Sequence, residues 1–252
     1  MTTPDGNGQH ADVQMPFTSH LGELRSRLIK SALAVAVAFL ACFYFVDTIF
    51  AILAAPVRRL NIPGLTLIGT GVTEAFFTKM KVGFAAAVIV ALPVLLWQGW
   101  QFVAPGLYEH EKRYTRSFVF AGSLFFMAGA AFCYIVVVQH GLRFLLHRYE
   151  VIGVRPMLQV GDYLSTVSRM VLVSGAMFEL PVIAIFTARV GLIDHRFLIR
   201  HSRYALITIA LLAAILTPPD LISQVLLMVP LMLLYALSIA VAYLARFRMN
   251  RL

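Results

Sequence analysis

The feature that most constrains this chain is a series of apolar runs, each near the length that a helix needs to cross a membrane. About 20 mostly apolar residues are enough to span the hydrocarbon as a helix. We therefore predict an all-α protein with six transmembrane helices. The expected spans cover residues 28–46, 76–97, 118–138, 168–188, 203–217 and 222–244.

The composition agrees with a membrane protein. Of the 252 residues, 60% are hydrophobic and 13% are charged, whereas a soluble domain carries about 25% charged residues. The net charge of +9 could suggest nucleic-acid binding. However, the lysines and arginines lie in short clusters beside the apolar runs, where they act as topological anchors. We interpret the chain as a polytopic membrane protein that does not bind nucleic acid.

The basic residues also predict the orientation. With six spans, both ends lie on one side, and a cytoplasmic N-terminus would give that side thirteen lysines and arginines against eight on the other. This distribution favours an N-in/C-in topology. We expect a disordered cytoplasmic tail at 1–15, a single membrane domain at 16–245 and a short tail at 246–252. No internal repeat or separate soluble domain is evident.

Two of the expected spans are short. Only 14 residues separate Arg203 from Pro218, and they reach about 21 Å against about 30 Å of hydrocarbon. The second span is similar if Lys81 and the interfacial Trp97 mark its limits. A short span must thin the bilayer, lie behind longer neighbours or work in a complex.

The segments outside the membrane predict a structured cap. Residues 47–75 and 139–167 combine prolines, glycines and apolar residues, and we expect them to fold together on the side opposite the termini. Pro56 is expected at a turn of this cap.

Glu179 lies in the stretch SGAMFELP, about midway along the fourth expected span. A carboxylate there costs at least about 2.5 to 3.5 kcal/mol, so it should face a partner, water or another helix. Two interpretations stay open: a neutral group hydrogen-bonded inside the bundle, or a functional group for proton relay or docking of a polar helix. Pro181 frees a carbonyl near position 177 and predicts a bend.

The segment LTPPDLISQ at 216–224 predicts a tight helical hairpin. Pro218 ends one helix and Asp220 caps the next. Gln224 then enters an apolar run, where its amide needs a partner such as Thr217 or a helix of another protein.

A polar segment, HLGELRSRL at 20–28, precedes the first apolar run and is expected to be helical and outside the hydrocarbon. His20, Glu23 and Arg27 share one helical face. Glu23 and Arg27 have the i, i+4 spacing of an ion pair worth only about 0.3 to 0.5 kcal/mol. Glu23 can therefore exchange Arg27 for a better partner.

A second polar segment, WQGWQFVAPGLYEHEKRY at 97–114, joins spans two and three on the cytoplasmic side. Pro105 breaks the chain, and Glu109 and Glu111 follow at the start of a helix. Two interpretations stay open. Acidic residues there can cap a helix, or they can form an acidic site with aromatic neighbours that suits a guanidinium.

Catalytic motifs such as HExxH, GxSxG, a P-loop or a dinucleotide-binding glycine pattern do not occur in the sequence, and its histidines lack metal-ligand spacing. We therefore expect no enzymatic activity, no cofactor and no metal.

Five segments, in this order, closely resemble the TatC family, the large receptor subunit of the twin-arginine protein translocase. The likeness runs from about residue 16 to 245, and its segments are HLGELRSRL, EAFFTKMKVGF, LPVLLWQGWQFVAPGLYEHEKRY, YLSTVSRMVLVSGAMFELPV and LTPPDLISQVLLMVPLMLLYALS. The resemblance implies a concave, six-helix, N-in/C-in protein of the bacterial cytoplasmic (inner) membrane. It also implies binding of twin-arginine signal peptides of folded precursor proteins, a multimeric complex with the single-span subunits TatA and TatB, and export driven by the proton gradient.

The resemblance also assigns roles to residues. It implies that Glu23 and Glu111 contact the paired arginines of the signal peptide, with the aromatic Phe102 tied to that site, and we place Arg25 of the first motif with them. The family's intramembrane glutamate falls on Glu179, and its polar pair for partner helices falls on Thr217 and Gln224. The expected structural turns are at Pro56, Pro105, Pro218 and Asp220.

Two positions depart from the family pattern. Gln139 stands where many relatives carry a proline, and Ser174 stands where an aromatic residue is common. We expect these changes to alter local geometry at the outer end of the third span. Two other function classes remain open: an ion-coupled small-solute transporter with Glu179 as proton carrier, and an assembly scaffold without a ligand site.

Overall fold

The computed structural model describes residues 17–60, 65–103, 115–151, 156–189, 195–217 and 221–249. Most of them are helical. In chain order, the elements are α1 (Phe17–Tyr44), α2 (Val46–Arg59), β1 (Thr66–Ile68), α3 (Glu74–Val103), α5 (Thr115–Phe132), η2 (Cys133–Val138), α6 (Gln139–Val151), β2 (Met157–Gln159), α7 (Val160–Phe178), α8 (Leu180–Arg189), α9 (His195–Arg200), α10 (Ser202–Leu216) and α11 (Leu221–Met249).

Within the described residues, five helical segments are long and apolar enough to cross a membrane: Leu21–Tyr44, Glu74–Phe102, Thr115–His147, Val160–Thr187 and Leu221–Tyr243. A sixth apolar helix, Ser202–Leu216, is shorter. These six segments coincide with the six expected spans and confirm the all-α membrane fold. The short fifth span agrees with the sequence, because α10 has only 15 residues.

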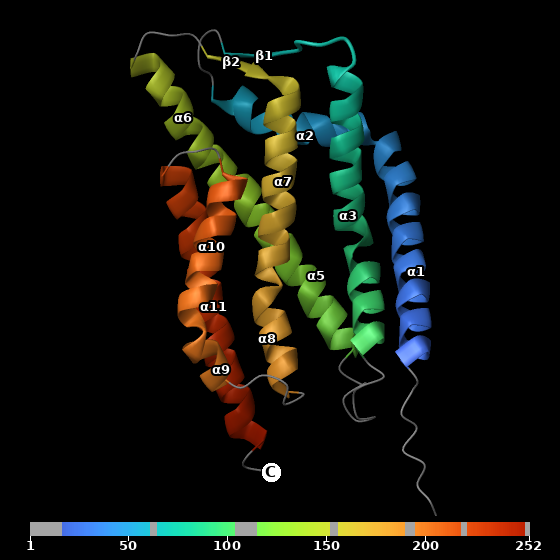
Figure 1. Ribbon diagram of the computed structural model, residues 1–252. Coiled ribbons are helices and arrows are strands. Elements are labelled where there is room, and N and C mark those ends of the chain that lie inside the picture. The colour runs from blue at the N-terminus through green and yellow to red at the C-terminus, as the bar shows by residue number, and fades with distance from the viewer. Residues whose placement is uncertain are drawn as a thin grey trace, which may run out of the picture.

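The helices form an open row rather than a closed bundle. In Figure 1, α1 lies at one edge and the α10–α11 pair near the other; α6 runs obliquely from the upper left and continues into α5, which passes behind α7. Helix α1 packs mainly on α3, and α11 packs on α8 and α10. The described start of α1 and the end of α11 lie at the same end of the molecule. This arrangement agrees with the predicted N-in/C-in topology.

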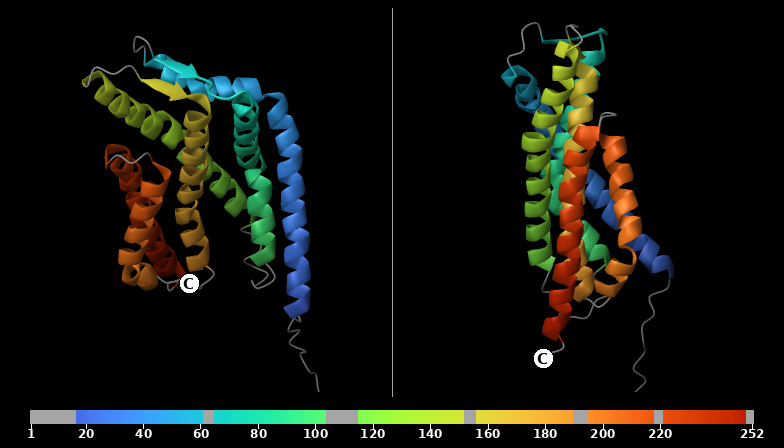
Figure 2. Two further views of the ribbon diagram at one scale, coloured as in Figure 1. Left: turned by 45° about the horizontal axis from the view of Figure 1, so that its top comes forward. Right: turned by 90° about the vertical axis from the view of Figure 1, so that its left-hand side faces the viewer.

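A cap covers the opposite end, as the sequence predicts. Helix α2 lies crosswise to the long helices, and the strands β1 and β2 lie beside it (Figures 1 and 2). The two strands have three residues each and pair in parallel, with Thr66 opposite Met157. They are a small exception to the all-α prediction.

The expected turn at Pro56 is wrong, because Pro56 lies inside α2 and is buried. A proline has no amide hydrogen, so the carbonyl four residues earlier loses its helical donor. In this structure, the Tyr134 hydroxyl donates to the Ile52 carbonyl at 2.5 Å. A neighbouring helix thus satisfies the freed group, and α2 continues through the proline.

The predicted limits of the second and third spans also need correction. Helix α3 has 30 residues, so it is not a short helix. Lys79 near its start forms an ion pair with Asp47 of α2, which holds the charged end in the cap. The third helical segment runs past position 138, because the backbone N–H of Gln139 donates to the Val136 carbonyl. A proline at 139 would remove this donor.

Candidate functional site

The polar segment at the start of α1 is connected to α3. Nη2 of Arg27 donates to Oε1 of Glu23 at 3.1 Å, which confirms the predicted i, i+4 pair. Nη1 of Arg27 donates to Oε1 of Gln98 on α3 at 3.4 Å. Glu23 and Arg27 each keep about a quarter of their side-chain surface exposed, at 24%. The Glu23 carboxylate is therefore positioned on α3 while it remains accessible from the tail end of the molecule.

Aromatic residues follow Gln98 along α3. Phe102 comes four residues later, so it lies on the same face of α3 as Gln98, and it is half-buried. Trp100 is buried, and its ring lies 4.8 Å from that of Phe118 and 5.1 Å from that of Phe186. This aromatic packing fixes the end of α3 that carries Phe102.

Of the other predicted residues of this site, only Arg25 lies in the described part of the chain. Arg25 is exposed and, two residues from Glu23, points to a different side of α1. Glu111 and Pro105 lie outside the described residues.

Glu179 lies between α7 and α8, where the predicted bend occurs. Helix α7 ends at Phe178, α8 begins at Leu180, and the Glu179 amide donates to the Ala176 carbonyl at 3.2 Å. Because the span runs from Val160 to Thr187, Glu179 is about 28 Å from its cap end and about 12 Å from its other end. Glu179 therefore lies off the centre of this helical segment, because α7 begins eight residues earlier than predicted.

The Glu179 side chain is buried, with 5% of its surface exposed. Neither carboxyl oxygen has a hydrogen-bond partner among the described residues. The side chain packs against α5, since a Cβ at Gly122 would lie 2.8 Å from its Oε2. A buried carboxyl group without a partner is costly, so Glu179 is a candidate for contact with a group from another molecule.

Helices α10 and α11 pack against each other, as the predicted hairpin requires. Oγ1 of Thr217 donates to the Ala213 carbonyl at 2.9 Å, within its own helix end. Nε2 of Gln224 donates across the hairpin to the Ala210 carbonyl at 3.4 Å. Gln224 therefore pairs with backbone of α10 and not with Thr217. Pro218 and Asp220 lie outside the described residues.

The sequence reasoning missed two polar residues. One is Gln98. Its position four residues before Phe102, on the same helical face, is the sequence pattern that could have identified it. The other is Glu74, at the start of α3. Its Oε2 accepts from the Thr70 amide at 2.6 Å and from the Gly71 amide at 3.1 Å, and its Oε1 accepts from the Gly161 amide at 2.7 Å. Glu74 thus joins the loop before α3 to the start of α7.

Metal chemistry has no candidate site in the described part of the chain. No group of three or more His, Cys, Asp or Glu side chains there could hold an ion.

The comparisons with known proteins agree on one family. The family model of the Sec-independent protein translocase protein (TatC) matches residues 19–230. A TatC protein of Desulforapulum autotrophicum is 42% identical over 89% of this chain and 83% of its own length. A TatC protein of Campylobacter jejuni is 43% identical over 88% of this chain and 91% of its own length.

Solved structures agree as well. The crystal structure of a twin-arginine translocase receptor, TatC, superposes with a TM-score of 0.82 and 37% sequence identity, and the match covers 90% of this chain and 99% of the other. A second crystal structure of such a receptor, in the detergent DDM, gives a TM-score of 0.81 at the same identity. The chain therefore belongs to the TatC family of Sec-independent protein translocases, multi-pass proteins of the bacterial cytoplasmic membrane.

Proposed function

We propose that this protein is the receptor and core subunit of a twin-arginine translocase. It binds the twin-arginine signal peptides of folded precursor proteins and nucleates assembly with TatA- and TatB-type single-span subunits. The sequence has no nucleotide-binding motif, and in this proposal the proton gradient drives export. Both crystal structures similar to this chain are of a twin-arginine translocase receptor.

The observation that carries the proposal is the position of Glu23. Its carboxylate is accessible at the tail end, and Arg27 and Gln98 connect it to the helix that bears Phe102. An i, i+4 pair at a partly exposed site is weak. An incoming guanidinium that binds with two parallel hydrogen bonds has the better geometry. In the proposal, Glu111 supplies the second carboxylate for the second arginine.

Site-specific photocrosslinking from position 26 to a twin-arginine precursor tests this binding site. Ser26 is exposed on α1, one turn from Glu23, so the probe leaves the carboxylate intact. Glu23→Gln and Glu111→Gln should each lower the crosslinking yield by about tenfold, since a charge-assisted hydrogen bond is lost. A twin-lysine precursor should behave like the variants. Asp47→Asn, an equivalent change in the cap, should leave the yield unchanged. An unchanged yield in the Glu23→Gln, Glu111→Gln double variant, with normal membrane insertion, would refute the site.

For partner helices, we propose contacts at Glu179 and at the hairpin residues Thr217 and Gln224. The support is that both carboxyl oxygens of Glu179 lack partners among the described residues. Ala176, three residues earlier, is exposed. A cysteine at 176 should form disulfides with cysteines in the membrane helix of a TatA- or TatB-type subunit, and Glu179→Leu should reduce the yield severalfold. If purified protein alone moved a small solute across liposomes, the transporter interpretation would replace this one.

A further inference from the structure

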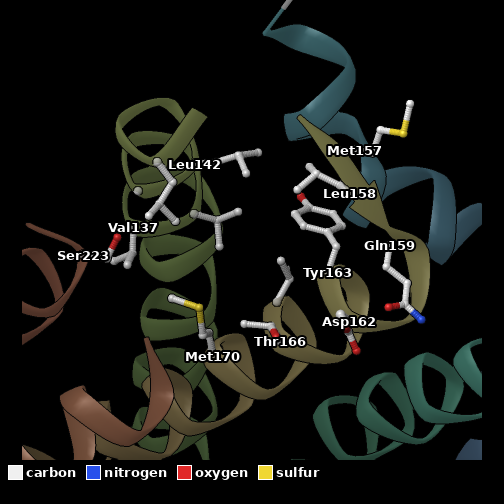
Figure 3. A pocket seen from close by; sticks show the side chains of 14 residues that line it. Val137, Leu142, Met157, Leu158, Gln159, Asp162, Tyr163, Thr166, Met170 and Ser223 are labelled. Atoms are coloured by element: carbon white, nitrogen blue, oxygen red, sulfur yellow. The ribbon is translucent and has the colours of Figure 1, made fainter. Parts of the chain in front are cut away.

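A cavity of about 450 Å³ lies under the cap, between α6, β2 and α7. Its walls are mainly apolar, including Val137, Leu142 and Leu158 (Figure 3). Gln159 and Asp162 line one side, and Met170 and Ser223 line the opposite side. A cavity with apolar walls in a membrane protein loses contacts if it stays empty, so an apolar occupant would be favoured.

The length of the cavity fits one leaflet of the bilayer. The α7 residues at its wall begin at Asp162, near the cap, and end at Met170, while Val160 is the first residue of the helix. From Asp162 to Met170, the helix rises about 12 Å, which is within one half of the roughly 30 Å hydrocarbon. A molecule of the cap-side leaflet can therefore reach the inner end of the cavity without crossing the membrane.

The cross-section fits a chain and not a helix. A helix with its side chains is about 10 to 12 Å wide and rises 5.4 Å per turn, so 450 Å³ takes only about one turn. The inner end is also closed, because a Cβ at Gly141 of α6 would lie 2.5 Å from Oγ of Ser223 on α11. A transmembrane helix could not pass between these two residues.

The polar end of the cavity carries a negative charge. Asp162 is exposed and has no ion pair or hydrogen bond to any other described residue. Gln159 donates its Nε2 to Oγ1 of Thr70 at 2.7 Å, so its amide group is held in place and presents an acceptor oxygen. A carboxylate and an amide oxygen together suit a group with several N–H donors and a positive charge.

We propose that this cavity binds a phospholipid with a primary ammonium headgroup, such as phosphatidylethanolamine, from the cap-side leaflet. One acyl chain fills the apolar part of the cavity down to Met170, and the ammonium group donates to the Asp162 carboxylate and to Oε1 of Gln159. The site is distinct from the proposed signal-peptide site, which lies at the other end of the molecule.

Photolabelling of the full chain in vesicles tests this site. The probe is phosphatidylethanolamine with a diazirine in one acyl chain, compared with phosphatidylcholine bearing the same chain. Both headgroups are zwitterionic and carry the same charges, but only the primary ammonium has N–H donors. Labelled peptides are mapped by mass spectrometry. The measured ratio is the labelling of the cavity segments, residues 137–145 and 158–170, divided by the labelling of residues 28–40. The latter include exposed apolar residues of α1, such as Leu33 and Leu40, that report bulk lipid and correct insertion.

The ratio should be about two- to fivefold higher for the ethanolamine lipid, which is the range of a partly exposed ion pair. Asp162→Asn should make the two lipids equal, whereas the matched Asp47→Asn, on the cap but outside the cavity, should keep the preference. Thr166→Phe, which fills the cavity, should lower the ratio for both lipids while α1 is labelled normally. Equal ratios in the unaltered protein, a preference that survives Asp162→Asn, or cavity labelling unaffected by Thr166→Phe would each overturn the proposal.

Discussion

Single glycines set the distance between α5 and α7. A Cβ at Gly129 would lie 2.6 Å from Cγ of Phe178, and a Cβ at Gly175 would lie 2.8 Å from the ring of Phe126. Each glycine thus lets an aromatic ring of the facing helix reach the backbone. Without a hydrophobic driving force between helices in lipid, such close packing is a main source of helix association.

Gly129→Ala should therefore destabilise the protein. The added methyl group overpacks the contact with Phe178, which typically costs about 1 to 3 kcal/mol. Gly99→Ala is the matched control, because a Cβ there meets nothing within 4 Å, and alanine stabilises a helix by about 0.5 to 1 kcal/mol. Unfolding can be followed by a thiol-reactive dye, since Cys42 and Cys133 are both buried. A midpoint for Gly129→Ala equal to that of Gly99→Ala would contradict this packing.

The packing around Ser174 explains why an aromatic residue, common at this position in the family, is absent here. It is completely buried, and its Oγ donates to the Gly129 carbonyl at 3.1 Å. An aromatic side chain has no room there, so Ser174→Phe should lower the unfolding midpoint far more than Ser174→Ala. The alanine variant loses one hydrogen bond worth about 0.5 to 1.5 kcal/mol. Similar midpoints for the two variants, in the same thiol assay, would show that the aromatic residue fits.

At the scale of elements, the cap depends on Glu74 more than on its two short strands. The carboxylate accepts hydrogen bonds from the loop before α3 and from the first turn of α7. It thereby holds together two segments that are 87 residues apart in the chain. The parallel pairing of β1 and β2 then follows from the positions of these segments.

Glu74→Gln should loosen the cap locally. The amide keeps one acceptor oxygen, so it cannot bind the Thr70, Gly71 and Gly161 donors together. We expect hydrogen exchange at these amides to quicken on the order of tenfold, as in a local opening, with little change in α5 or α11. Asp47→Asn, which removes the ion pair with Lys79, is the control and should leave exchange at Gly161 unchanged. Uniform acceleration throughout the chain would indicate global destabilisation instead.

Elements marked by local chemistry were predictable, and those made by tertiary contacts were not. The end of α10 at Leu216 and the break at Glu179 follow from prolines, which act on their own helix. The turn predicted at Pro56 is wrong because the Ile52 carbonyl, which the proline leaves without a helical donor, accepts a hydrogen bond from Tyr134, far along the chain. The roles of Gln98 and Glu74 depend in the same way on groups supplied by α1, α7 and the loop before α3. Glu179 was identified as a lone acidic residue in an apolar run, but its position along the helical segment required the true start of α7.

At the scale of the whole molecule, the open row of helices leaves long apolar faces uncovered. On α1, Leu28, Leu33 and Leu40 are each more than half exposed, which suits contact with lipid or with other subunits. At the other edge, α10 extends about 22 Å. The bilayer must therefore be thinner beside α10 than beside α3, if hydrophobic mismatch is to be avoided.

The six-span topology predicts which ends of the helices face the cytoplasm. Cysteines at Ser26 on α1 and at Ser202 at the start of α10 should both face the cytoplasm, whereas a cysteine at Gly69 should face outward, because the cap lies at the opposite end. In intact cells, a membrane-impermeant maleimide should label Gly69→Cys alone, and Ser26→Cys and Ser202→Cys only after the membrane is opened. The native Cys42 and Cys133 are buried and should add little background. Labelling of Ser202→Cys in intact cells would place the start of α10 on the outer side and would contradict the six-span topology.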